Sequence, residues 1–154
     1  VTKLSPDLIT VIVGDGPLMA KCQEDARLMG IADRVYFVGQ KVPEEMPSYY
    51  SLADVLLLPS DREGWANVLL EAMACRTPVV SRAIGGAPDL IVEDRAGRVV
   101  DSAKPEDLAC AVNDVLKHLP KREKVRQFAE KYGWAETSSS QKRIFEAVLL
   151  EHKT

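Results

Sequence analysis

The sequence has few of the residues that mark several common classes of protein. It contains three cysteines, Cys22, Cys75 and Cys110, an odd number without CxxC spacing, so neither a disulfide framework nor a zinc site is expected. Each cysteine lies in an apolar helical pattern, which predicts buried free thiols and a reducing, cytoplasmic location. The apolar runs fall short of the ~20 residues that a membrane-spanning helix needs, and the first residues do not resemble a signal peptide.

The sequence also has little excess of either sign of charge. The 154 residues include 20 Lys and Arg against 23 Asp and Glu, a formal net charge of −3, and the longest basic cluster is interrupted by Glu123. Nucleic-acid binding needs clustered cations that neutralise phosphates, so this balance argues against a nucleic-acid partner. No HExxH, GxSxG or Walker sequence is present, and no DxD pair is available for a metal.

Short apolar runs alternate with helical patterns along the chain. Strands are predicted at residues 8–13, 34–38, 54–58, 78–81 and 97–100. Helices are predicted at residues 18–29, 44–51, 68–75, 87–92, 105–119, 121–131 and 137–152. In the last helix Ile144, Phe145 and Val148 are expected to face inward. Apolar strands alternating with helices indicate a doubly wound α/β fold, with a parallel sheet covered on both faces.

Such sheets bind ligands at the carboxyl ends of their strands. That rule selects four loops, at residues 14–17, 39–43, 59–67 and 81–86. The first loop carries Gly14 and Gly16, but GxG alone is weak evidence for nucleotide binding. The full GxGxxG pattern is absent, and a tight turn explains the two glycines equally well.

The segment at residues 60–75 is the most informative. Its helix is apolar apart from Glu71, which predicts a buried helix and a buried carboxylate that needs a polar partner. A ligand and a nearby arginine are both candidates for that partner. Asn67 is a candidate N-cap, which leaves the next three backbone amides available to an anion such as phosphate. Ahead of the helix, Glu63 is followed by Gly64, which lets a ligand approach the backbone closely.

Glu63 and Glu71 are separated by seven residues, and this region resembles the E-x7-E signature of the retaining GT-B glycosyltransferases of the group 1 family. The resemblance extends through the strand and loop at residues 11–17, the strand at 35–39 and the "AD…PS" strand at 53–60. It continues through Glu-Gly-Trp-Ala-Asn-Val-Leu-Leu-Glu-Ala-Met-Ala-Cys-Arg-Thr-Pro-Val-Val at 63–80, the glycine pair at 85–86 and the region of Trp134. It therefore covers nearly the whole chain.

The resemblance implies that residues 1–154 form a single donor-binding domain, the second of the family's two Rossmann-like domains. Glu71 would then hydrogen-bond the ribose of a nucleotide-diphosphate sugar. Glu63 would be the catalytic residue, positioning the donor sugar and supporting its charge. The other implied donor-binding residues are Gly64, Trp65, Asn67, Val68 and Leu69 beside the sugar and phosphate, Gly39, Gln40 and Val42 beside the base, and Gly14 and Gly16. The family needs no bound metal, so no metal and no cofactor besides the donor is expected.

Two departures from the family pattern carry structural expectations. Arg76 stands where glycine is usual, and since arginine tolerates positive φ poorly, a local adjustment of the turn is expected. The family's domain opens with a further strand and helix that this sequence does not contain, so a fragment of a longer protein is expected. The strands at 8–13 and 54–58 would then pair directly or leave the sheet gapped. A gap would expose strand edges and favour dimerisation.

The first functional hypothesis is therefore the donor-binding half of a retaining sugar transferase. Its partners would be the nucleotide-sugar donor and an acceptor domain outside this sequence. Many relatives build lipopolysaccharide, capsule or lipid-linked glycans, so the resemblance implies a cytoplasmic full-length protein that could associate peripherally with the cytoplasmic membrane face. The alternatives are a nucleotide-sugar-binding module without catalysis and a sugar-nucleotide epimerase of similar shape. The string at residues 63–74 favours the transferases over the epimerases.

Overall fold

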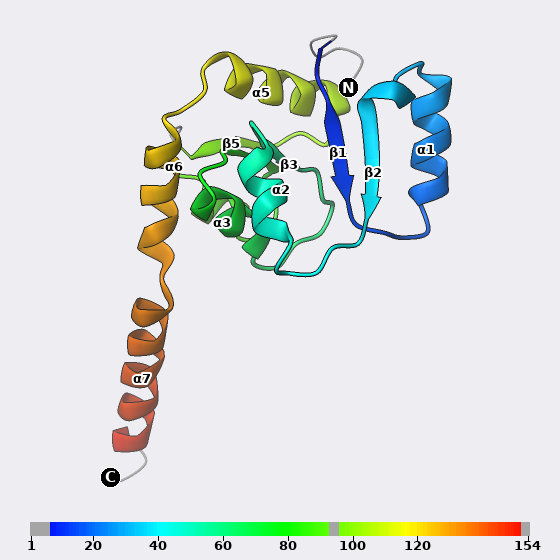
Figure 1. Ribbon diagram of the computed structural model, residues 1–154. Coiled ribbons are helices and arrows are strands. Elements are labelled where there is room, and N and C mark those ends of the chain that lie inside the picture. The colour runs from blue at the N-terminus through cyan, green and yellow to red at the C-terminus, as the bar shows by residue number, and fades with distance from the viewer. Residues whose placement is uncertain (1–6, 93–95, 152–154) are drawn as a thin grey trace.

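The computed structural model describes residues 7–92 and 96–151 as an α/β fold (Figure 1). The strands are β1 (Thr10–Val13), β2 (Val35–Gly39), β3 (Leu56–Leu58), β4 (Val79–Arg82) and β5 (Gly97–Val100). The α-helices are α1 (Met19–Leu28), α2 (Met46–Leu52), α3 (Asn67–Ala74), α4 (Ala87–Leu90), α5 (Pro105–Lys117), α6 (Arg122–Ala129) and α7 (Trp134–Glu151). Short 3-10 helices lie at Ala32–Arg34 and Glu130–Tyr132. The order and type of the elements confirm the prediction from the sequence.

The five strands form two sheets rather than one. β1 pairs with β2, while β3, β4 and β5 form a separate sheet with β4 in the middle, and every pairing is parallel. Among the described residues no ladder joins β1 to β3. Of the two arrangements expected from the sequence, the gapped sheet is therefore the one observed.

The larger sheet is covered by helices on both faces, as its apolar strands predict. Val79 and Val80 are neighbours in β4 and both are fully buried, so their side chains point to opposite faces of the sheet. Val79 packs with side chains from the α3, α4 and α6 side, among them Leu69, Met73, Leu90, Val125 and Phe128. Val80 packs with residues of α5, namely Leu108, Val112 and Val115. These two cores hold the loops at the carboxyl ends of β3 and β4 in place.

The smaller sheet has much less cover. Ala26 is the one buried residue of α1, and Val11 of β1 is 49% exposed. All three cysteines are free thiols, as expected, but the prediction that they are buried is wrong for Cys22 on α1 and Cys110 on α5, both of which are exposed. Apolar spacing identifies the face that these helices would bury. Whether the face is buried depends on a neighbouring element, and the described residues provide none at these two positions.

The last helix, α7, extends away from the rest of the fold (Figure 1). Ile144 is 61% exposed and Phe145 is 66% exposed, and Val148 is also exposed, so the expectation that this stripe faces inward is wrong for the described part of the chain. None of the described helices combines the length and apolar content that crossing a membrane requires.

Candidate functional site

The loops after β1 and β2 meet through two glycines. Gly14 has φ 131° and donates its amide to the carbonyl of Gly39, which has φ 69°, at 2.9 Å. Both angles lie in the region that favours glycine. The Asp15 carboxylate accepts the Gly16 amide at 2.7 Å, and the Val42 amide donates to Glu45 Oε2 at 3.3 Å. These loops are thus held by their own backbones, and among the described residues no hydrogen bond joins them to the loop that carries Glu63.

The loop that carries Glu63 lies directly against the loop that follows β4. The Gly86 amide donates to the Gly64 carbonyl at 2.8 Å. A Cβ on Gly85 would lie 2.3 Å from that same carbonyl oxygen, and a Cβ on Gly86 would lie 2.6 Å from the ring of Trp65. The glycine pair therefore permits a contact that other residues would block. Glu63 itself is half-buried, and Trp65 is 52% exposed.

Arg82 binds the residues at the start of the same loop, a role that the sequence did not suggest. Its guanidinium, at the carboxyl end of β4, donates to the Ser60 carbonyl at 3.3 Å and forms an ion pair with Asp61. The side chain is 18% exposed, and its Nε is buried without a hydrogen-bond partner among the described residues. Strand β4 therefore anchors the residues that lead into Glu63.

The first turn of α3 leaves the Val68 backbone amide available. The helix begins at Asn67, Ala66 stands at the N-cap, and no side chain caps it, so the prediction that Asn67 is the N-cap is wrong. The Leu69 amide donates to the Ala66 carbonyl at 3.0 Å, which removes it from the predicted set of free amides. The Val68 amide donates to no group in the described part of the chain. A partly positive helix end with a free amide suits an anion.

Glu71 lies on the exposed side of α3, because the helix turns Leu69, Ala72 and Met73 toward the core instead. The expectation of a fully buried helix and carboxylate is therefore wrong. Glu71 Oε2 accepts a hydrogen bond from the hydroxyl of Tyr50 on α2 at 2.9 Å. The polar partner is thus a tyrosine rather than the arginine considered from the sequence. Burial, and then the hydrogen bond and charge of Glu71, raise the pKa of the Tyr50 phenol above its usual value, so the hydroxyl stays a donor.

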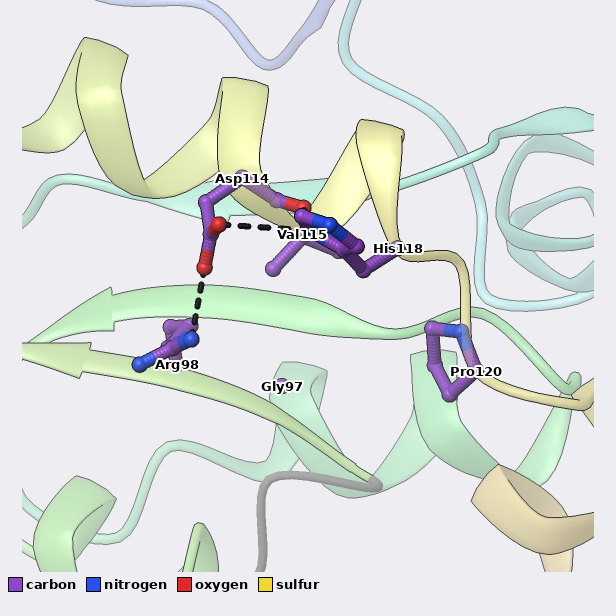
Figure 2. A pocket seen from close by; sticks show the side chains of 6 residues that line it. All are labelled: Gly97, Arg98, Asp114, Val115, His118 and Pro120. Carbon is purple, nitrogen blue, oxygen red and sulfur yellow. Dashed lines mark hydrogen bonds and ion pairs between the residues drawn. The ribbon is translucent and has the colours of Figure 1, made fainter.

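A cavity of about 240 Å³ opens elsewhere, at the amino end of β5 (Figure 2). Arg98 Nη2 lies 2.6 Å from Asp114 Oδ2, and His118 Nδ1 lies 3.3 Å from Asp114 Oδ1. These groups interact with one another at the amino end of β5, whereas Glu63 follows the carboxyl end of β3. Among the described residues no group of three or more His, Cys, Asp and Glu is placed to hold a metal ion.

Comparison with known proteins identifies the family. Residues 1–132 match the family model described as glycosyl transferases group 1. The chain belongs to the group 1 glycosyl transferases. This membership confirms the resemblance found in the sequence.

Two relatives are considerably longer than this chain. It is 37% identical over 118 residues to a GDP-mannose-dependent alpha-(1-6)-phosphatidylinositol monomannoside mannosyltransferase of Mycolicibacterium smegmatis, covering 72% of this chain and 31% of the relative. It is 34% identical over 154 residues to a D-inositol 3-phosphate glycosyltransferase of Corynebacterium urealyticum, covering 93% of this chain and 36% of the relative. The chain thus spans about a third of the length of these curated relatives.

The fold also matches solved GT-B glycosyltransferases. The structure of sucrose-phosphate synthase from Thermosynechococcus elongatus superposes with a TM-score of 0.76 at 26% identity, covering 90% of this chain and 38% of the other. The α/β assignment made from the sequence is confirmed.

Proposed function

We propose that this chain binds a nucleotide-diphosphate sugar and forms the donor-binding half of a retaining glycosyltransferase. The observation that carries the proposal is α3, which combines the free Val68 amide in its first turn with an exposed Glu71 carboxylate one turn later. Membership of the group 1 family supports it, as does a 37% identical relative that is named as a GDP-mannose-dependent mannosyltransferase.

Each group would meet a different part of the donor. The Val68 amide, at the positive end of the helix, would bind the α-phosphate. Glu71 has one carboxylate oxygen held by Tyr50, and its other oxygen would accept a hydrogen bond from a ribose hydroxyl. Glu63, with the Gly64 and Trp65 backbone beside it, would face the donor sugar. Because Glu63 is half-buried, its charge would act on a cationic transition state with less screening by water than a fully exposed charge.

The base would lie beside Gly39, Gln40 and Val42. The Val42 amide donates to the Glu45 carboxylate and the Val42 carbonyl accepts the Glu45 amide, so the neighbours of Val42 would supply the contacts. Further parts of the proposal rest on the family resemblance: transfer with retention, no metal requirement, an acceptor domain outside these residues, and action at the cytoplasmic membrane face.

The first experiment measures donor binding. Calorimetry on the purified chain with GDP-mannose, UDP-glucose and ADP-glucose is expected to show weak, saturable binding of at least one donor and no transfer to acceptors. Absence of binding across this panel would contradict the donor assignment. Transfer by the chain alone would contradict its assignment as one half of the enzyme, while binding that never supports transfer in the full-length protein would favour the non-catalytic module.

The second experiment tests Glu71. We expect Glu71→Gln to weaken nucleotide binding by about 1.5–3 kcal/mol, the loss of a hydrogen bond to a charged acceptor. The unfolding free energy should change little because the side chain is exposed. Glu136→Gln removes an exposed carboxylate from α7 and is the matched control, expected to bind as the wild type does. Unchanged affinity in Glu71→Gln would show that the ribose assignment is wrong.

A further inference from the structure

Tyr50 is a core residue whose polar end reaches the candidate site. Its side chain is 5% exposed and packs in the cluster that contains Leu69 and Met73 of α3. Its hydroxyl extends to Glu71 Oε2 at 2.9 Å. The ring is therefore fixed by packing while the hydroxyl contacts a carboxylate on the exposed side of the neighbouring helix.

The backbone of Tyr50 is fixed as well. Thr77, which follows α3 and is fully buried, donates its hydroxyl to the Tyr50 carbonyl at 2.5 Å. The same carbonyl accepts the Ala53 amide at 3.2 Å at the end of α2. Helices α2 and α3 also pack against each other. Tyr50 is thus held at two places, by its hydroxyl at Glu71 on α3 and by its carbonyl at Thr77 just after that helix.

Glu71 is a side chain that benefits from such support. An exposed glutamate samples several rotamers, and binding a ligand through it requires that freedom to be lost. The bond from Tyr50 holds Oε2, while Oε1 has no hydrogen-bond partner among the described residues. Both oxygens of a carboxylate are hydrogen-bond acceptors. The bond from Tyr50 to Oε2 therefore leaves Oε1 able to accept a hydrogen bond from a ligand.

We propose that Tyr50 is a positioning residue that holds Glu71 ready for a ligand diol and so gives the site its preference for ribonucleotides over deoxyribonucleotides. This inference rests on the proposed function, since it requires Glu71 to contact the ribose. A purely structural Tyr50 would influence all ligands equally, because a change in the fraction of folded protein does not depend on the sugar of the nucleotide. The ratio of two affinities therefore separates the two roles.

The test compares GDP and UDP with their 2′,3′-dideoxy analogues by calorimetry in the wild type, Tyr50→Phe, Glu71→Gln and the double variant. The phenylalanine ring preserves the packing, so Tyr50→Phe is expected to fold and to lose only a few degrees in Tm. Tyr49→Phe is the matched control, because the neighbouring tyrosine hydroxyl makes no hydrogen bond within the described residues.

We expect the wild type and Tyr49→Phe to prefer the ribonucleotide about tenfold, and Tyr50→Phe to prefer it only about twofold to threefold. In the Glu71→Gln background the further change Tyr50→Phe should leave the ratio unaltered, because the two residues act through one carboxylate. A wild type that discriminates, together with a Tyr50→Phe variant that discriminates equally, overturns the positioning role alone. A wild type that binds both sugars equally overturns the ribose assignment of Glu71, and the role of Tyr50 with it.

Discussion

At the scale of single residues, Arg76 shows how a side chain can occupy a position suited to glycine. The expected adjustment of the turn is not observed. Arg76 keeps φ 70°, the left-handed conformation that glycine adopts there without strain. Its guanidinium lies 3.6 Å from Glu123 Oε1, but both side chains are at least half exposed, so the pair offsets little of the strain.

Replacing Arg76 by glycine is therefore expected to stabilise the fold. Relief of the left-handed strain is worth about 1–3 kcal/mol, and the extra freedom of glycine in the unfolded chain removes about 0.5–1 kcal/mol of that gain. We expect Arg76→Gly to raise the unfolding free energy by about 1 kcal/mol in urea titrations. Arg76→Ala keeps the strain while removing the ion pair, and it should not stabilise. Equal stabilities of the two variants would show that the turn is unstrained.

The partner of Glu71 illustrates what could not be predicted from the sequence at this scale. The position of Glu71 in an apolar helix correctly indicated that a polar group would meet it. Tyr50 is 21 residues away on another helix, and only the packing of α2 on α3 brings the two together. Arg82 likewise gave no signal, because its targets are a carbonyl and a carboxylate on a loop about 20 residues earlier.

At the scale of elements, local signals were sufficient for the helices and strands themselves. β5 has the predicted bounds, and α5 begins at Pro105, because proline is suited to the first turn of a helix and glycine to chain reversals. Burial was the property most often mispredicted. It depends on which elements pack together, and α1, α7 and the exposed side of α3 lack the neighbours that their apolar residues suggested.

The contact between the loops after β3 and β4 leads to a prediction at this scale. A Cβ at position 85 would collide with the carbonyls of Glu63 and Gly64, which are backbone atoms that cannot rotate aside. We expect Gly85→Ala to lower the unfolding free energy by about 1–3 kcal/mol and to weaken donor binding, because the loop carrying Glu63 must move. Urea titration and calorimetry measure the two effects.

Two other glycines serve as controls for this variant. A Cβ on Gly133 meets its nearest atom at 3.9 Å, so Gly133→Ala should leave both quantities nearly unchanged. A Cβ on Gly64 meets nothing within 4 Å, so Gly64→Ala should preserve stability and, if the donor approaches there, reduce affinity alone. A stable, fully binding Gly85→Ala would show that the loop contact does not position Glu63.

At the scale of the whole molecule, the chain exposes more surface than its size requires. Its accessible surface is 10565 Å², whereas a compact monomer of 17.0 kDa is expected to expose about 7,700 Å². Large apolar side chains are exposed in the places where cover is missing. These are the β1–β2 sheet, with Ile9, Val11 and Tyr36, the outer strand β3, with Leu57, and the projecting helix α7, with Ile144, Phe145 and Leu149.

Parallel strands with apolar side chains and one unpaired edge are prone to pair with other chains. β1, β2, β3 and β5 each have a single strand neighbour among the described residues, so the purified chain is expected to self-associate through such edges. Sedimentation velocity from about 5 to 200 μM should show the average mass rising with concentration.

Val11→Lys places a charge on β1 and should reduce association, whereas Gln23→Lys adds the same charge on the exposed side of α1 and should not. If Phe145→Lys abolishes association and Val11→Lys does not, α7 rather than the sheet edge is the contact surface. A constant monomer mass over the whole range would mean that neither surface is sufficient to hold two chains together.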